Sequence, residues 1–285
     1  MRDVSLIIKT FERQQVLERL LDSIAVQGYA DCPILVADDS REPYRDAIVE
    51  QYGDLVDEYL VLPFNSGVSK GRNELLERVD TRYFVLNDDD FVYGDITDLE
   101  TARRELVEHD LDILGGQLAE KRKSYHYDWI PTRVSNWIGL YSEHWEKGAW
   151  VADIRETSDG GIKMEPYPAP SALQPCDLAL QFFIARTSAV RDTVGGWNPK
   201  LKSNGEHWEF FYRCKQAGLR VASSQRFGTY HVPKQNERYE KFRYGKKRDM
   251  ITRSLEEHGF KYLEKEHRTY HAGENDGPSQ NRQTE

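Results

Sequence analysis

Apolar segments rich in β-branched residues alternate with helical patterns through the first ninety residues. The apolar segments lie at 4–8, 33–37, 59–64 and 83–87. Runs of this kind are typical of strands covered on both faces in a parallel sheet. Apolar residues at helical spacing separate the first two segments, and a second helix is predicted over 68–79. The alternation predicts an α/β fold: a doubly wound, mostly parallel sheet with helices on both faces and a ligand site at the carboxyl ends of its strands.

The pattern is less regular after residue 110. A strand is expected near 112–116, a helix over 206–217 and a short strand at 220–223. Charged residues with helical spacing follow at 234–267, and the polar tail from Gly273 is expected to be disordered. We predict a catalytic domain, a helical C-terminal extension and a tail, at 1–232, 233–272 and 273–285. Within the catalytic domain we expect a nucleotide-binding part at 1–117 and an acceptor-side part at 118–232.

Composition excludes several classes of protein. The formal net charge of −9 opposes a nucleic acid as the main partner, since phosphate backbones select for surplus lysine and arginine. Three cysteines lie far apart without a CxxC pair, so neither a disulfide framework nor a cysteine zinc site is predicted. No window approaches the roughly 18 uncharged apolar residues of a membrane span. The expected compartment is the cytoplasm. Two alternatives are peripheral contact with the inner face of a membrane and a chain from which an anchor has been removed.

Two of the predicted strands end in acidic clusters. Asp38 and Asp39 follow the second strand, and Asp88, Asp89 and Asp90 follow the fourth. Carboxylates this close repel one another unless cations, hydrogen-bond donors or water compensate them. A hard divalent cation such as Mn2+ or Mg2+ is the simplest compensator. Acidic residues at strand ends can alternatively form turns and helix caps. This alternative explains the first pair as well as a cation does, but it explains the triplet less well.

Five segments, in order, resemble the inverting glycosyltransferases of family 2, which have the GT-A fold. The segments are SLIIKTFER, VADDS, FNSGVSKGRNELL, VLNDDDF and WNPKLKSNGEHWEFFYRCKQAGLRV. Within that family the motifs are most similar to ganglioside-type N-acetylgalactosaminyltransferases and to the catalytic domains of chondroitin polymerases. The resemblance covers about 4–231 and implies a UDP-sugar donor and a glycan or glycoconjugate acceptor.

The resemblance also implies roles for individual residues around the donor. Thr10 and Glu12 would line the nucleotide pocket, the Asp38–Asp39 pair would bind the nucleotide with Asp39 on the uracil, and Arg72 would lie near the diphosphate. Asp88 would face the ribose or the metal ion, and Asp89 or Asp90 would bind that ion; the run of aspartates permits two registers. His231 would be a third ligand or, alternatively, a hydrogen-bonded loop residue. Trp197 would pack on the sugars or anchor the core.

The base that accepts the proton of the acceptor hydroxyl is sought at the start of the helix predicted over 206–217. The family has a Glu-Asp pair there, whereas this chain has Glu206 and His207, with Glu209 following. The three side chains are rival candidates. An unperturbed histidine has a pKa near 6.5, which suits a base at neutral pH. Glutamates in a first helical turn can also be purely structural, because the helix dipole favours negative charge there.

We therefore predict a metal-dependent, inverting glycosyltransferase that moves a hexose or N-acetylhexosamine from a UDP-sugar to an acceptor hydroxyl. The first loop lacks the glycines of a dinucleotide-binding enzyme, and no P-loop is present. A sugar-phosphate nucleotidyltransferase and a catalytically silent nucleotide-sugar- or glycan-binding module are the alternatives. Tyrosines and tryptophans between 125 and 150 would form an acceptor wall or a small core of their own.

Overall fold

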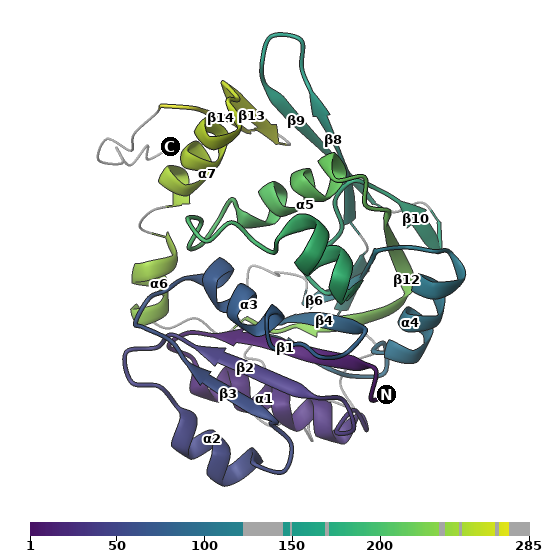
Figure 1. Cartoon of the computed structure of the whole chain (residues 1–285), viewed down its shortest axis with the longest axis vertical. Helices are drawn as coiled ribbons and strands as arrows, with labels where there is room; N and C mark the ends of the chain where they lie inside the picture. Colours follow the sequence, from purple (N-terminus) through teal and green to yellow (C-terminus); the bar gives the residue numbers. More distant parts are fainter. Residues whose placement is uncertain are drawn as a thin grey trace.

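A central sheet with helices on both faces forms the body of the protein (Figure 1). The computed structural model describes residues 1–121, 145–148, 150–168, 171–233, 237–244, 247–265 and 268–273. The strand order is β10-β12-β6-β11-β4-β1-β2-β3, with β5 on β12 and β7 on β6. The expected acceptor wall lies mostly outside the described residues, as does the tail from residue 274.

The N-terminal half is the predicted parallel α/β unit. It comprises β1 (Val4–Thr10), α1 (Gln14–Val26), β2 (Ile34–Asp38), α2 (Arg45–Tyr52), β3 (Glu58–Val61), α3 (Val68–Leu76), β4 (Tyr83–Asp88), β5 (Phe91–Val92) and α4 (Leu99–Glu108). Strands β3, β2, β1 and β4 pair in parallel. The α/β fold with helices on both faces is therefore confirmed.

Alternate residues of the strands bury opposite faces of this sheet. Leu6 and Ile8 pack into a core with α1 and α4, whereas Ile7 packs into a second core with α3 and α5. Two predicted elements end earlier than expected. The third strand stops before Pro63, which has no backbone N–H to donate to a sheet. The second helix ends at Leu76, after which the N–H of Arg78 closes a tighter turn on the carbonyl of Leu75.

The acceptor-side part completes the central sheet and starts a second one. It comprises β6 (Ile113–Lys121), β7 (Trp145–Gly148), β8 (Trp150–Glu156), β9 (Ile162–Pro168), β10 (Leu173–Pro175), β11 (Phe183–Arg186), the π-helical η2 (Ala189–Val194), α5 (Glu206–Gln216) and β12 (Val221–His231). Strand β11 runs antiparallel between β4 and β6. The strand expected at 220–223 continues to His231, because after a bulge it pairs again with β6 from Gly228 onward.

The C-terminal extension is helical only in its first part. Helices α6 (Glu237–Tyr244) and α7 (Lys247–His258) are followed by a hairpin, β13 (Tyr262–Lys265) and β14 (Arg268–His271). Gly259, with φ of +72°, allows the chain to leave α7, and Leu263 of β13 is then buried in the second core. Strand β13 pairs in parallel with β9, so the extension and the β8–β9 hairpin share one sheet. The predicted all-helical extension is wrong at these strands, because β13 pairs with β9, a hundred residues away, and β14 pairs with β13.

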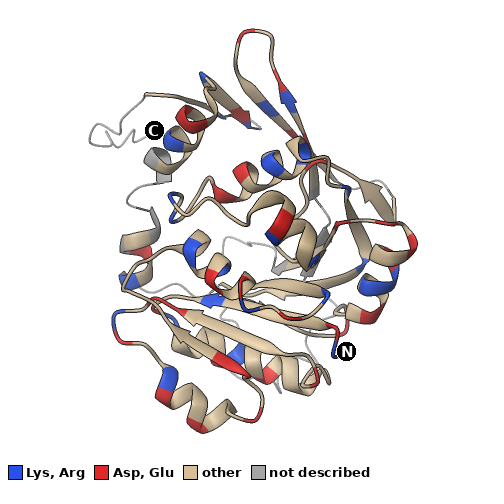
Figure 2. Cartoon of the chain, viewed as in Figure 1, with Lys and Arg blue, Asp and Glu red and all other residues tan. Residues whose placement is uncertain are grey.

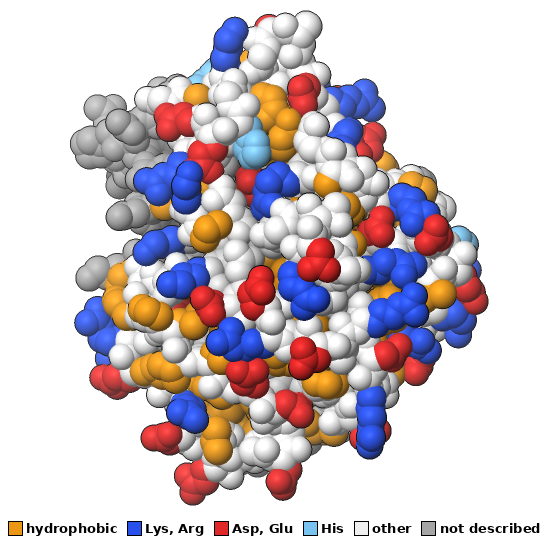
Figure 3. Space-filling view, viewed as in Figure 1, with side chains coloured by type: hydrophobic (Ala, Val, Ile, Leu, Met, Phe, Trp, Pro, Cys, Tyr) orange, Lys and Arg blue, Asp and Glu red, His pale blue; other side chains and the backbone are white. Residues whose placement is uncertain are grey.

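Charge is spread evenly over the described elements. Lysine and arginine alternate with aspartate and glutamate along the ribbon, and both signs are interspersed on the face seen in the space-filling view (Figures 2 and 3). Within the described part of the chain, no helix has the length and apolar character needed to cross a membrane.

Candidate active site

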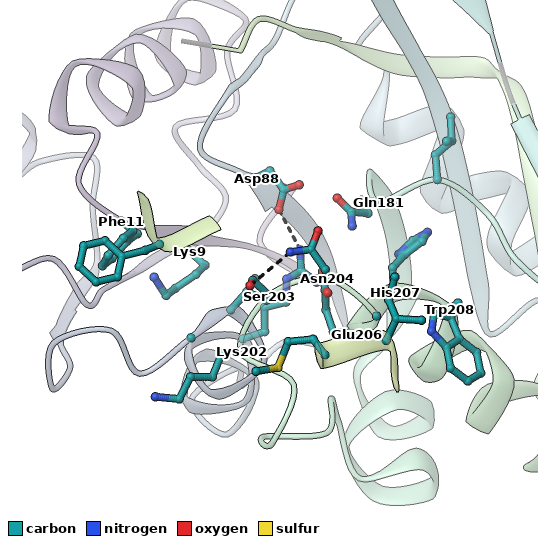
Figure 4. Close-up of a pocket in the computed structure, with 18 of the residues that line it drawn as sticks. Lys9, Phe11, Asp88, Gln181, Lys202, Ser203, Asn204, Glu206, His207 and Trp208 are labelled. Carbon is teal, nitrogen blue, oxygen red and sulfur yellow. Dashed lines mark hydrogen bonds and ion pairs between the residues drawn. The ribbon is translucent and has the colours of Figure 1, made fainter. Parts of the chain in front are cut away.

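A cavity of about 940 Å³ lies at the carboxyl ends of β1 and β4. Its wall is built by β1, α3, β4 and α5 and is completed by α6, α7 and β13 from the C-terminal extension. This volume is in the range of small-molecule sites, roughly 300–1,000 Å³. Asp88 and Gln181 point toward the same space, with Glu206 and His207 nearby (Figure 4). The sheet edge predicted to hold the ligand is thus the edge where the cavity lies.

Asp39 fixes the loop between β3 and α3. Its side chain is buried, forms an ion pair with Lys9, and accepts a hydrogen bond from the N–H of Gly67 at 2.7 Å. Gly67 has φ of +98°, and a Cβ there would lie 2.6 Å from the Cα of Lys202, so only glycine fits. Asp39 lines the cavity as expected, and each of its oxygens retains a second lone pair for a ligand.

Asp38 and Glu12 are engaged by neighbouring loop residues and are not among the residues that line the cavity. Asp38 accepts hydrogen bonds from the N–H of Ser40 at 2.8 Å and from the hydroxyl of Tyr59 at 2.8 Å. Glu12 accepts one from the N–H of Arg41 at 2.8 Å. Neither carboxylate lines the cavity, so contact with the nucleotide is not supported for them. Asp38 instead has the turn-forming role given above as the alternative.

The three aspartates after β4 have different surroundings. Asp88 is the most open, with its side chain 25% exposed, and its Oδ1 lies 2.9 Å from Nη2 of Arg72. Asp89 is buried, accepts a hydrogen bond from the hydroxyl of Thr10 at 2.8 Å and forms an ion pair with Arg13. Asp90 Oδ2 lies 3.0 Å from Nη1 of the same guanidinium. Burial raises the pKa of Asp89, and the charge of Arg13 opposes that rise.

Arg13 is the main residue of this site that the sequence did not indicate. Its guanidinium pairs with two buried carboxylates and lies 3.9 Å from the ring centroid of Tyr239 on α6. Arg13 immediately precedes α1, which begins at Gln14. One signal could have identified it. A cationic residue that follows one strand is expected near the acidic residues that end a neighbouring parallel strand.

Two of the candidate metal ligands, Asp90 and His231, lie close together, although only Asp90 lines the cavity. Nε2 of His231 lies 3.7 Å from Oδ2 of Asp90. Two donors bound to one small divalent ion at about 2.1 Å lie no more than about 4.2 Å apart, so this pair can share an ion. Arg13 pairs with both Asp89 and Asp90, so a cation at Asp90 would compete with that guanidinium; Asp89 is engaged further by the hydroxyl of Thr10. Within the described ranges no three His, Cys, Asp or Glu side chains gather as a complete metal site.

The candidate bases at the start of α5 have different surroundings. Glu206 lines the cavity with Oε1 4.0 Å from Nη1 of Arg72. His207 also lines it, and its Nε2 lies 2.9 Å from the carbonyl oxygen of Ala179. A carbonyl only accepts, so Nε2 carries the hydrogen and Nδ1 has the lone pair. Burial lowers the pKa of His207 to about 3, with contributions from the charges of Arg72 and Lys265.

Glu209 and Trp197 lie outside the cavity. Burial alone would raise the pKa of Glu209, but hydrogen bonds from His258 at 3.1 Å and Arg213 at 2.8 Å lower it overall. Glu209 therefore ties α5 to α7, and this geometry opposes its candidacy as the base. Trp197 is buried and stacks on Phe210 with ring centroids 4.7 Å apart, so it is the core anchor of the two interpretations and not a sugar platform.

The sequence model for Glycosyl transferase family 2 matches residues 5–167, more than half of the chain. The chain belongs to glycosyltransferase family 2. This glycosyltransferase is 31% identical over 211 residues to β-1,4 N-acetylgalactosaminyltransferase 2 of Mus musculus and 32% identical over 210 residues to β-1,4 N-acetylgalactosaminyltransferase 1 of Homo sapiens. Both alignments cover 73% of this chain but only 35% of the relative, so the chain spans about a third of their length.

Solved glycosyltransferase structures share the fold. S. aureus TarS 1-349 in complex with UDP-GlcNAc superposes with a TM-score of 0.59 at 18% identity, over 90% of this chain and 66% of that one. GalNAc-T7 with UDP, GalNAc and Mn2+ gives a TM-score of 0.61 at 13% identity, over 90% of this chain and 48% of that one. The expected GT-A fold of this family 2 glycosyltransferase is confirmed.

Proposed function

We propose that the cavity binds a UDP-sugar and that the enzyme transfers its hexose or N-acetylhexosamine, with inversion, to a hydroxyl of an acceptor glycan. The observation that carries the proposal is the state of Arg72. Its side chain is 1% exposed, yet its Nε and Nη1 have no hydrogen-bond acceptor among the described residues. Buried donors of a charged group are costly to leave without acceptors. The oxygens of a diphosphate can supply such acceptors.

The names of similar proteins support the nature of the donor. TarS is described with UDP-GlcNAc, GalNAc-T7 with UDP and GalNAc, and the curated relatives are N-acetylgalactosaminyltransferases. UDP-N-acetylgalactosamine, UDP-N-acetylglucosamine and UDP-galactose are therefore the donors to examine first. Thr10, Phe11 and Asp39 at the ends of β1 and β2 would surround the nucleotide, since all three line the cavity.

Asp90 and His231 would hold a divalent cation, with Asp88 beside them. A cation that bridges a nucleotide diphosphate needs only one or two protein ligands, because phosphate oxygens and water supply the rest. An imidazole ligand favours Mn2+ over Mg2+. When bound, the cation would neutralise charge on the departing diphosphate.

We assign His207 as the base from its place in the cavity and its tautomer; the expected pKa near 6.5 is not retained, and the lowered pKa makes this imidazole a weaker base than an unperturbed histidine. The Ala179 carbonyl fixes its tautomer, so that Nδ1 is the basic nitrogen. Glu206 faces the Arg72 guanidinium, an arrangement that suits positioning of the diphosphate-binding residue more than proton abstraction. In the transfer, Nδ1 would accept the proton of the acceptor hydroxyl as its oxygen bonds to the anomeric carbon, and the bond from that carbon to the UDP oxygen would break.

Donor binding is expected to raise the melting temperature. At about 100 times its Kd, UDP with Mn2+ should stabilise the folded state by about 2.7 kcal/mol, or about 5 °C. The measurement is a thermal-shift screen of UDP-sugars with Mn2+ or EDTA on the wild type and on H231A. The shift should shrink in EDTA and in H231A. Equal shifts with Mn2+ and with EDTA would contradict the proposed role of the metal ion. Equal shifts with UDP and with GDP would contradict the proposed selectivity for uridine.

Activity is expected to be flat between pH 8 and about pH 5.5, because His207 stays unprotonated down to a pKa of about 3. Since this pKa lies below the usual 6.5, folding favours the neutral ring, and that contribution to stability is lost as the pH falls from about 6.5 towards 3. The rate should therefore be expressed per folded enzyme. NMR titration of the imidazole resonance that is missing in H207Q gives the pKa directly, and a midpoint near 6.5 contradicts this expectation.

A further inference from the structure

The segment that leads into β11 is held in place on both sides of Gln181. Ala179 and Phe182 are fully buried. A Cβ on Gly115 of β6 would lie 2.4 Å from the Cβ of Ala179, so glycine is needed for this close approach. The N–H of Gly116 donates to the carbonyl oxygen of Phe182 at 2.8 Å. The backbone around Gln181 is therefore fixed, and its side chain starts from a rigid position.

The Gln181 amide has hydrogen-bonding capacity that the fold does not use. Its side chain is half-buried and lines the cavity. In the described part of the chain it makes no hydrogen bond, and both amide atoms are accessible to solvent. Two other neutral residues of the cavity differ, since Thr10 donates to Asp89 and Asn204 donates to Ser203. An amide has two N–H donors and one carbonyl acceptor, so Gln181 can both donate to a ligand and accept from it.

The pairing of β11 with β4 brings Gln181 near Asp88. The two strands are antiparallel, with Phe183 opposite Leu86. Gln181 lies two residues before Phe183. Asp88 lies two residues after Leu86, so both residues are found beyond the same end of the pairing. Figure 4 shows their side chains directed into the same space. Asp88 also faces Arg72, the residue to which we assign the diphosphate.

The same segment contacts the assigned base. The carbonyl oxygen of Ala179, two residues before Gln181, accepts the hydrogen bond from Nε2 of His207. In the close-up, Gln181 lies between Asp88 and His207 (Figure 4). In the proposed reaction the transferred sugar lies between the diphosphate and the base, because its anomeric carbon leaves the UDP oxygen and bonds to the acceptor oxygen. The space that Gln181 faces is therefore where this sugar is expected.

We propose that the Gln181 amide hydrogen-bonds a polar substituent of the transferred sugar, a hydroxyl or an acetamido group, and thereby selects the donor. The inference rests on the proposed function, because it requires a UDP-sugar whose diphosphate is bound at Arg72. Hydroxyl and acetamido groups both donate and accept, so the amide can pair with either. A sugar that lacks the substituent would shield the amide from water without replacing its hydrogen bond, and would bind more weakly.

The test is calorimetry of donor binding in the presence of Mn2+. The parent donor is whichever of the three UDP-sugars named above binds the wild type most tightly. It is compared with UDP and with analogues that each lack the polar substituent at C2, C3, C4 or C6 of the sugar. The proteins are the wild type, Q181M and the control Q174M. Methionine has a similar length but no amide, and Gln174 is a half-buried glutamine of β10 that does not line the cavity.

For the wild type and Q174M, removal of one particular substituent should weaken binding about three- to tenfold, the usual net effect of one hydrogen bond. Q181M should bind the parent donor more weakly by a similar factor and should lose no further affinity when that substituent is absent. The analogue that behaves in this way identifies the group that Gln181 contacts, and the C2 analogue distinguishes an acetamido group from a hydroxyl elsewhere on the ring.

Three results would overturn the inference: equal losses for every analogue in the wild type and Q181M, a wild type that binds the parent donor no more tightly than UDP, or a Q181M protein that no longer binds UDP, which would indicate a structural role. UDP itself should bind equally to all three proteins. Absence of UDP binding to the wild type would overturn the proposed function instead.

Discussion

Replacing His207 with alanine is expected to lower kcat about 10²–10⁴-fold, the usual contribution of a general base. The Kd for UDP should stay the same, because the His207 side chain bonds to the carbonyl oxygen of Ala179 and not to Arg72 or Asp39. Initial rates of UDP release in the presence of acceptor, together with calorimetry of UDP binding, measure the two quantities. A loss confined to kcat identifies a group that acts during the reaction.

Two further variants separate the possible roles of the start of α5. H207Q retains an N–H that can donate to the Ala179 carbonyl but has no imidazole, so its rate should be as low as that of H207A. E206Q should mainly strengthen UDP binding, because the loss of the carboxylate charge beside Arg72 leaves that guanidinium more attractive to a diphosphate. A large loss of kcat in E206Q alongside a near-normal rate in H207A would transfer the base assignment to Glu206.

The donor side of the site could be predicted from the sequence because its determinants are local. Each strand is a short apolar run, and parallel strands end at one edge, so Thr10, Asp39 and Asp88 had to lie near one another. The motifs around them also carry the family resemblance. The partners of the aspartates could not be predicted in the same way. Arg13 turns toward Asp89 and Asp90 because two buried carboxylates need a cation, and that need arises only once the strands have assembled.

The acceptor side depends on contacts between distant segments, and predictions were weaker there. Glu206 and Glu209 both lie in the first turn of α5, and spacing alone does not say which faces a cavity. His258 of α7, 49 positions after Glu209, binds the Glu209 side chain and so keeps it away from the cavity. The strands β13 and β14 lie in a charged segment that resembles helix, and their pairing with β9 overrides that local preference. Lys265, the last residue of β13, reaches the cavity beside Met164 through this pairing.

Substituting Arg13 with methionine is expected to reduce the free energy of unfolding by about 3–5 kcal/mol, the usual cost of removing one partner of a buried ion pair. Asp89 and Asp90 would remain buried without their cation. The measurement is urea unfolding at pH 7, compared with K200M, which removes an exposed partner of Glu257 and should cost less than about 1 kcal/mol.

The pH dependence and a second substitution distinguish this charge effect from simple loss of packing. In R13M the pKa of Asp89 should rise further, because burial would no longer be opposed by the guanidinium. The folded state would then bind protons more readily than the unfolded state, so the deficit of R13M relative to the wild type should shrink as the pH falls from 7 toward 5. The double variant R13M/D89N should recover part of the loss at pH 7, since one buried charge is removed. A deficit that is the same at both pH values and is not reduced by D89N would show that Arg13 stabilises the fold through its packing on Tyr239, and that Asp89 and Asp90 are compensated by other groups.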